Sequence, residues 1–78
     1  MDDAVSRAVT EWDAGDLGCG ELVLELRARL DTLEPGQIMK VTARDPGAPA
    51  DVPAWCRMTG NPLVGGAPPV YLIRRKED

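Results

Sequence analysis

Residues 19–33 read CGELVLELRARLDTL, and this stretch has the clearest secondary-structure signal in the chain. Four leucines recur at i, i+4, i+8 and i+11: Leu22, Leu26, Leu30 and Leu33. This spacing places them on one stripe of an amphipathic helix, with charged side chains on the opposite side. Pro35-Gly36 follows as a stop signal. The pattern predicts a helix over residues 19–33 whose leucine stripe faces the core.

Segments of β-forming residues lie on both sides of this helix. We expect strands over residues 8–13, 38–43, 63–64 and 70–74. A second helix is predicted to begin with Asp51 as its N-cap and to end at Gly60-Asn61-Pro62. Pro53 is acceptable there, because the N–H that a proline lacks has no helical partner in the first turn. The order strand-helix-strand-helix-strand-strand predicts an α+β fold with both helices on one face of a single sheet.

The composition restricts the chemistry that the chain can perform. Its 78 residues predict a single domain over residues 1–78, with residues 1–7 expected to be flexible. The absence of histidine excludes a Ser-His-Asp triad, a Cys-His pair and a His-built zinc site. Two cysteines do not suffice for a four-thiolate metal site, so we expect no metal and no cofactor. Carboxylate chemistry, the chemistry of a single thiol, or binding remains.

The charge and the apolar pattern restrict the partners and the compartment. Thirteen acidic and nine basic side chains give a net charge of −4, whereas nucleic-acid binders usually carry the opposite sign, so no direct contact with nucleic acid is expected. No apolar run approaches the ~20 residues of a membrane span, and the acidic start Met1-Asp2-Asp3 is unlike a signal peptide. We expect a cytoplasmic protein with reduced thiols that is small enough to be a monomer.

Cys19 is the main candidate for chemistry. It lies between Gly18 and Gly20 in the first turn of the predicted helix. The free N–H groups and the partial positive charge of a helix N-terminus stabilise a thiolate. The flanking glycines leave the sulfur accessible to a large partner, whereas the charge of Glu21 opposes the thiolate. Position alone leaves two interpretations open, a reactive thiol and a small buried residue.

Cys56, the second cysteine, lies on the apolar stripe of the second predicted helix together with Val52. We interpret it as a small core hydrophobe, which is the usual role of a free cysteine in such a position. A weaker hypothesis is a redox switch that joins Cys56 to Cys19, which requires the two sulfurs to come within bonding reach.

The remaining polar candidates have a structural interpretation that is stronger than the functional one. Asp45 and Asp51 bracket a loop rich in Pro and Gly, where paired carboxylates can perform acid–base work or bind a hard cation. We favour a turn at Asp45 and a helix cap at Asp51. Trp55 is expected in the core, with the rim of a partner site as the alternative, and Arg57 and Arg44 are expected to be solvated.

A set of short motifs runs through the chain between Ala8 and Lys76. They are Leu17-Gly18-Cys19, Leu33-Glu34-Pro35-Gly36, Asp45-Pro46, Asp51-Val52-Pro53-Ala54-Trp55 and Gly60-Asn61. Together they resemble the TusA/SirA-like sulfur-carrier family, and the combination of Asp-Pro with Asp-Val-Pro-x-Trp is the most specific part. The resemblance implies a two-layer sandwich with β-α-β-α-β-β order and a four-stranded mixed sheet.

The resemblance also implies a sulfur relay, and Cys19 matches the cysteine that carries the sulfur. This cysteine accepts sulfane sulfur as a persulfide from a cysteine desulfurase or a rhodanese-like donor and passes it to an acceptor protein. Six residues are candidates for partner docking: Gly18, Gly20, Glu21, Trp55, Arg57 and Asn61. Four residues are expected to be structural: Asp45, Pro46, Asp51 and Pro53.

Two motifs depart from the family pattern. The family's C-P-x-P reads Cys19-Gly20-Glu21-Leu22 here, and its Gly-His reads Gly60-Asn61. Gly20 makes the turn more flexible than proline would, and Glu21 adds a negative charge beside the sulfur. The alternative hypothesis is therefore a non-catalytic interaction or regulatory module on the same fold that has lost sulfur transfer.

Overall fold

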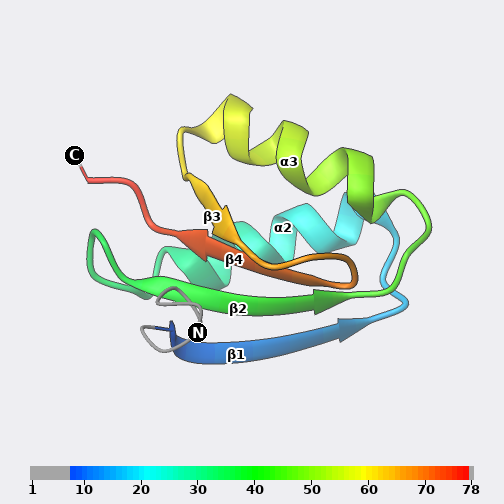
Figure 1. The fold of residues 1–78 in the computed structure, drawn as a ribbon, viewed down its shortest axis with the longest axis horizontal. Helices are drawn as coiled ribbons and strands as arrows, with labels where there is room; N and C mark the ends of the chain where they lie inside the picture. Colours follow the sequence, from blue (N-terminus) through cyan, green and yellow to red (C-terminus); the bar gives the residue numbers. More distant parts are fainter. Residues whose placement is uncertain (1–7, 78) are drawn as a thin grey trace.

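The computed structural model describes residues 8–77, and its elements follow the predicted order (Figure 1). They are β1 (Ala8–Gly15), α2 (Cys19–Leu30), β2 (Ile38–Ala43), α3 (Ala48–Thr59), β3 (Leu63–Gly65) and β4 (Val70–Arg74). The expected flexibility of residues 1–7 concerns a segment outside the described residues. Within residues 8–77, no helix has the length and apolar character needed to cross a membrane.

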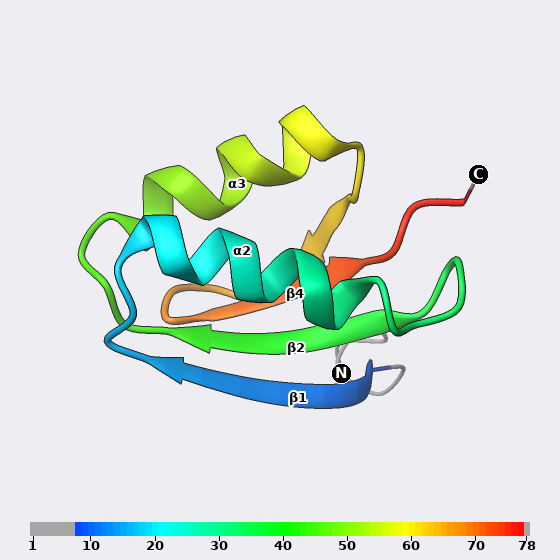
Figure 2. The ribbon, with the colours of Figure 1, turned by 180° about the vertical axis from the view of Figure 1, so that it is seen from behind.

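The four strands form one mixed sheet in the order β1-β2-β4-β3. β1 runs parallel to β2, whereas β4 is antiparallel to both of its neighbours, β2 and β3. Both helices cover the same face of the sheet (Figures 1 and 2). The predicted α+β architecture is thus confirmed, together with the mixed sheet that the family resemblance implied. β1 extends two residues beyond its predicted end, and β3 one residue.

The predicted leucine stripe of α2 forms the centre of the core. Leu22, Leu26 and Leu30 are buried and belong to one cluster with Met39 of β2 and Ile73 of β4. The i, i+4, i+8 spacing brings these leucines onto one side of the helix, so that a single face can be buried against the sheet. This packing holds α2 along the sheet and therefore determines where its first residue lies.

α2 ends at Leu30, three residues before the predicted end. The chain leaves the helix through tighter i→i−3 hydrogen bonds, from the N–H of Thr32 to the carbonyl of Arg29 at 3.2 Å and from the N–H of Leu33 to the carbonyl of Leu30 at 3.0 Å. Leu33 still packs against the core and is partly buried. The leucine spacing therefore predicts the buried residues correctly and overestimates the length of the helix.

α3 begins at Ala48, so the prediction that Asp51 is the N-cap is wrong. Gly47 is the cap residue, because its carbonyl accepts the first helical hydrogen bond, from the N–H of Asp51 at 2.9 Å. Asp51 instead lies in the first turn, where its charge is favourable to the helix dipole. The predicted stop is confirmed, since Gly60 ends α3 in a left-handed conformation with a φ of 80°.

The face of the sheet away from the helices carries a second, smaller cluster, formed by buried Ile38 and Leu72. Side chains alternate along β2, so Ile38 and Lys40 lie on this face while Met39 lies on the helix side. An ion pair of 3.5 Å between Lys40 and Glu11 bridges β2 and β1 there. This face is therefore partly apolar and partly stabilised by charge.

We expect Leu26→Ala to lower the free energy of unfolding by about 2–5 kcal/mol, because removing a fully buried leucine leaves a cavity. Leu24→Ala is the matched control on the same helix, since Leu24 is 72% exposed, and it should change this free energy by less than about 0.5 kcal/mol. Urea unfolding followed by tryptophan fluorescence measures both. An equal decrease in the free energy of unfolding in the two variants would contradict the assignment of Leu26 to the core.

Candidate functional site

Cys19 is the first residue of α2, where the chain passes from the sheet into the helix layer. β1 ends at Gly15, and residues 16–18 make the connection. Gly15 has a left-handed φ of 59°, and the N–H of Leu17 donates to the carbonyl of Ala14 at 3.2 Å, which closes the turn. The helix of Cys19 therefore begins at the end of the sheet where β1 ends (Figure 2).

The start of α2 provides hydrogen-bond donors and a partial positive charge. Gly18 is the N-cap and has no side chain that could accept a hydrogen bond from the first turn. The first helical bond runs from the N–H of Leu22 to the carbonyl of Gly18 at 2.8 Å. The N–H groups before Leu22 have no acceptor within a regular helix. Such an end stabilises an anion, including a thiolate on the first residue.

The backbone on both sides of Cys19 is open to a partner. Gly18 and Gly20 are exposed, and a Cβ added at either glycine would lie within 4 Å of no atom beyond the adjacent residues and the nearby helix backbone. Glu21 is exposed as well and brings a negative charge to the first turn. Three of the residues predicted for docking thus lie together around Cys19 at one end of α2.

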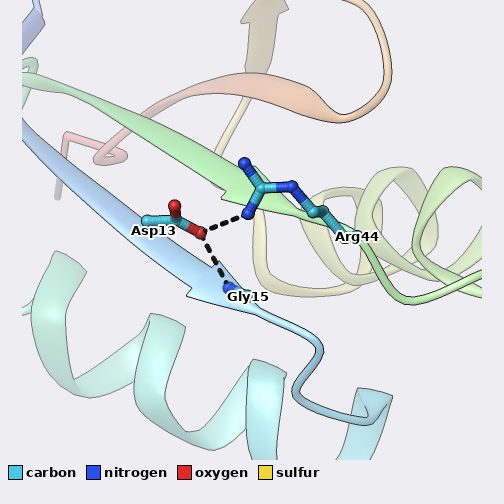
Figure 3. A network of polar contacts seen from close by, with 3 residues as sticks. All are labelled: Asp13, Gly15 and Arg44. Atoms are coloured by element: carbon cyan, nitrogen blue, oxygen red, sulfur yellow. Dashed lines mark hydrogen bonds and ion pairs between the residues drawn. The ribbon is translucent and has the colours of Figure 1, made fainter.

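A polar contact at the end of β1 supports this corner, and the sequence did not predict it. Asp13 Oδ1 accepts a hydrogen bond from the N–H of Gly15 at 2.9 Å and from Nη1 of Arg44 at 2.8 Å (Figure 3). The hydrogen bond from Gly15, assisted by that from Arg44, lowers the pKa of the Asp13 carboxyl group below its ordinary value. Arg44 was expected to be only solvated. The two residues meet because β1 and β2 run parallel and end at the same end of the sheet, which the sequence did not indicate.

The predicted structural residues lie in and after the loop between β2 and α3. Asp45 starts a turn as expected, since its Oδ2 accepts from the N–H of Gly47 at 2.9 Å. Pro46 is exposed in this turn. Pro53 lies half-buried inside α3, five residues after the helix begins at Ala48, so the prediction that it belongs to the first turn is wrong. No group of three or more Cys, Asp or Glu residues with the arrangement of a metal site occurs in the part of the chain that the structure describes.

The other predicted docking residues belong to the opposite end of α2. Trp55 and Asn61 line a surface hollow of about 250 Å³ together with Arg27 and Asp31, which lie in the last turn and at the C-cap of α2. A 12-residue helix is about 18 Å long, so this hollow is remote from Cys19. Arg57 is exposed in the last turn of α3.

Asn61 and Trp55 both have a structural role at this end. Asn61 is buried, its Oδ1 accepts from the N–H of Lys76 at 2.9 Å, and its Nδ2 donates to Oγ1 of Thr59 at 3.0 Å. It thereby ties the end of α3 to the segment after β4. Trp55 is buried in the main core, as the sequence predicted.

Cys56 is a free thiol that is buried in the main core. It is 4% exposed, and burial raises the pKa of its thiol from 9.0 to about 11, with Arg57 acting weakly in the opposite direction. At neutral pH the thiol is therefore protonated and shielded from partners. The prediction that Cys56 is a core residue is confirmed.

We expect iodoacetamide at pH 8 to modify Cys56 about a hundredfold more slowly in the folded protein than in urea, because two pKa units lower the thiolate fraction by that factor. The measurement uses Cys19→Ser, in which Cys56 is the only thiol, and follows the mass of the intact protein. Equal rates with and without urea would contradict the burial of this thiol.

Comparisons with known proteins show the family of this chain. The model of the family described as Sulfurtransferase TusA matches residues 10–74. The sulfur carrier protein TusA of Pseudomonas paraeruginosa is 37% identical over 70 residues, which cover 85% of this chain and 89% of that protein. The protein of the same name from Pseudomonas entomophila is 36% identical over 70 residues, which cover 85% and 88%. The chain therefore belongs to the TusA sulfurtransferase family, as its motifs suggested.

Proposed function

We propose that this protein is a sulfur carrier that relays sulfane sulfur through Cys19. The observation that carries the proposal is the position of Cys19 as the first residue of α2, behind a glycine N-cap, in a chain of the TusA family. The curated relatives are named as sulfur carriers, which supports the same role for this chain. The exposed glycines beside Cys19 suit a thiol that must meet two different proteins in turn.

The relay consists of two thiol–disulfide-type exchanges. The Cys19 thiolate attacks the terminal sulfur of a persulfide on the donor, a new S–S bond forms on Cys19, and the donor leaves as a thiolate. A thiolate of the acceptor then attacks the terminal sulfur on Cys19, which regains its own thiolate. No oxidant, reductant, metal or base from this chain is required. The N–H groups at the helix start stabilise the anionic sulfur in both states.

The missing prolines of the family motif do not prevent the helix start from forming. Leu22, at the position of the second proline, is fully buried, and its N–H makes the first helical hydrogen bond, to Gly18. A proline at this position could not donate that bond. Leu22 thus contributes core packing and a helical bond where the family has a rigid ring, so the helix start that the relay requires is retained.

The partners follow from this chemistry. The donor is a protein that forms a persulfide on its own cysteine, such as a cysteine desulfurase or a rhodanese-like protein, and the acceptor is a second thiol protein. The net charge of −4 favours protein partners over nucleic acid. We propose that the relay operates in the cytoplasm, where thiols stay reduced, and that the carrier is a monomer.

Incubation with a cysteine desulfurase and cysteine should add one sulfur atom to the wild-type protein, because Cys19 accepts the persulfide sulfur. Intact-mass measurement should show the same adduct on Cys56→Ser and none on Cys19→Ser. A rhodanese-like donor charged with thiosulfate is the second donor to test. An adduct that survives in Cys19→Ser, or no adduct on the wild type with either donor, would refute the proposed relay.

A further inference from the structure

A closed ring of hydrogen bonds holds the end of β1 next to the end of β2. Besides the two bonds accepted by Asp13, the backbone N–H of Arg44 donates to the carbonyl of Gly15 at 2.9 Å. Both backbone polar groups of Gly15 are therefore hydrogen-bonded: its N–H donates to Asp13, and its carbonyl accepts from Arg44. The guanidinium of Arg44 then closes the ring on the same carboxylate oxygen (Figure 3).

The ring surrounds an irregularity in the sheet. The register of β1 against β2 shifts between Asp13 and Gly15, so Ala14 is an additional residue in β1. Ala14 is buried in the helix-side core, and Gly15 then takes its left-handed conformation. Such a bulge bends the strand and changes the direction of the chain beyond it. The segment directly beyond this bulge is the three-residue connection to Cys19.

The ion pair in this ring is too exposed to be important for global stability. The side chain of Asp13 is 61% exposed and that of Arg44 is 51% exposed. Exposed pairs of this kind contribute little to the free energy of unfolding. Asp13 matters more for the local backbone conformation, because the same carboxylate oxygen accepts the hydrogen bond from the N–H of Gly15 in the bulge.

We propose that Asp13 is a positioning residue for sulfur transfer at Cys19, with Arg44 holding the Asp13 carboxylate in place. The inference rests on the proposed function of Cys19. The hydrogen bond to Asp13 holds the backbone of Gly15, which lies inside the turn closed by the bond from Leu17 to Ala14. Gly18, the N-cap of α2, directly follows Leu17. Loss of the hydrogen bond from Gly15 to Asp13 displaces the first turn of α2 relative to the surface that a donor contacts.

Three variants separate the two contacts of Asp13, each in the Cys56→Ser background. Asp13→Ala removes both contacts, whereas Arg44→Ala removes only the guanidinium. Asp13→Asn keeps an oxygen that accepts from Gly15 but loses the charge that binds Arg44. At saturating desulfurase we expect Asp13→Ala to accept sulfur about tenfold more slowly than the parent, since a misplaced reacting group costs up to about a hundredfold. Asp13→Asn and Arg44→Ala should lose about threefold or less.

Glu11→Ala is the matched control. Glu11 forms an ion pair with Lys40 across the same two strands, at 3.5 Å and with its side chain 75% exposed, but it lies in the middle of β1. Glu11→Ala should accept sulfur at the same rate as the parent. None of the variants replaces a residue beside Cys19, so in Asp13→Ala the half-saturating donor concentration should change less than the transfer rate at saturating donor. The melting temperatures of Asp13→Ala and Glu11→Ala should be similar in thermal unfolding.

Amide hydrogen exchange provides a readout that does not depend on sulfur transfer. In Asp13→Ala the amides of Leu17 and Leu22 should exchange about tenfold faster than in the parent, because the loss of a charge-assisted hydrogen bond loosens the corner. Glu11→Ala should leave both amides unchanged. Unchanged exchange in Asp13→Ala overturns the positioning role, whether or not the wild type accepts sulfur.

The transfer rates decide the remaining outcomes. The inference fails if Asp13→Ala accepts sulfur at the parent rate, if Asp13→Asn is as slow as Asp13→Ala, or if Glu11→Ala is equally slow. A wild-type protein that accepts no sulfur, combined with faster exchange in Asp13→Ala, refutes the proposed function of Cys19 and supports Asp13 as the residue that holds this corner.

Discussion

The burial of the α2 leucines against one face of the sheet is the constraint on which the rest of the structure depends. With Leu22 and Leu26 fully buried, α2 must lie along the sheet. Because β1 and β2 are parallel, the helix between them has to return the chain from the end of β1 to the start of β2. The first residue of α2 is therefore placed where β1 ends, and Arg44 reaches the same edge directly after β2.

This arrangement separates the two ends of α2 chemically. The N-terminal end has a glycine cap, free donors and an exposed backbone, which suit an anionic sulfur. The C-terminal end contributes Arg27 and Asp31 to a hollow that Trp55 and Asn61 complete. Residues that the family motifs group together thus belong to two regions, and only the first region contains Cys19. Asn61 in particular ties two segments of backbone together.

The two cysteines also differ through their places in the fold. Cys56 faces the core from α3, and burial raises the pKa of its thiol, so it is protonated at neutral pH. Cys19 instead begins a helix, where the first backbone N–H groups have no helical acceptor and the helix dipole is positive. Leu22 shows how the chain accommodates the loss of a motif proline, because it adds a helical hydrogen bond and a core side chain at the same position.

The sequence was sufficient for the order of elements, the leucine core, the burial of Cys56 and the place of Cys19 at a helix start, because periodicity and turn residues act locally along the chain. It was less reliable at helix ends: the start of α3 depends on the carbonyl of Gly47 rather than on Asp51, and α2 ends in a tighter turn before Leu33. The contact between Asp13 and Arg44, 31 residues apart, was not predictable, since it requires the parallel pairing of β1 and β2. The same applies to the separation of Asn61 from Cys19. Only the tertiary structure decided which distant residues meet, because the packing of the helices on the sheet, and not the local sequence, brings the two strand ends to one edge.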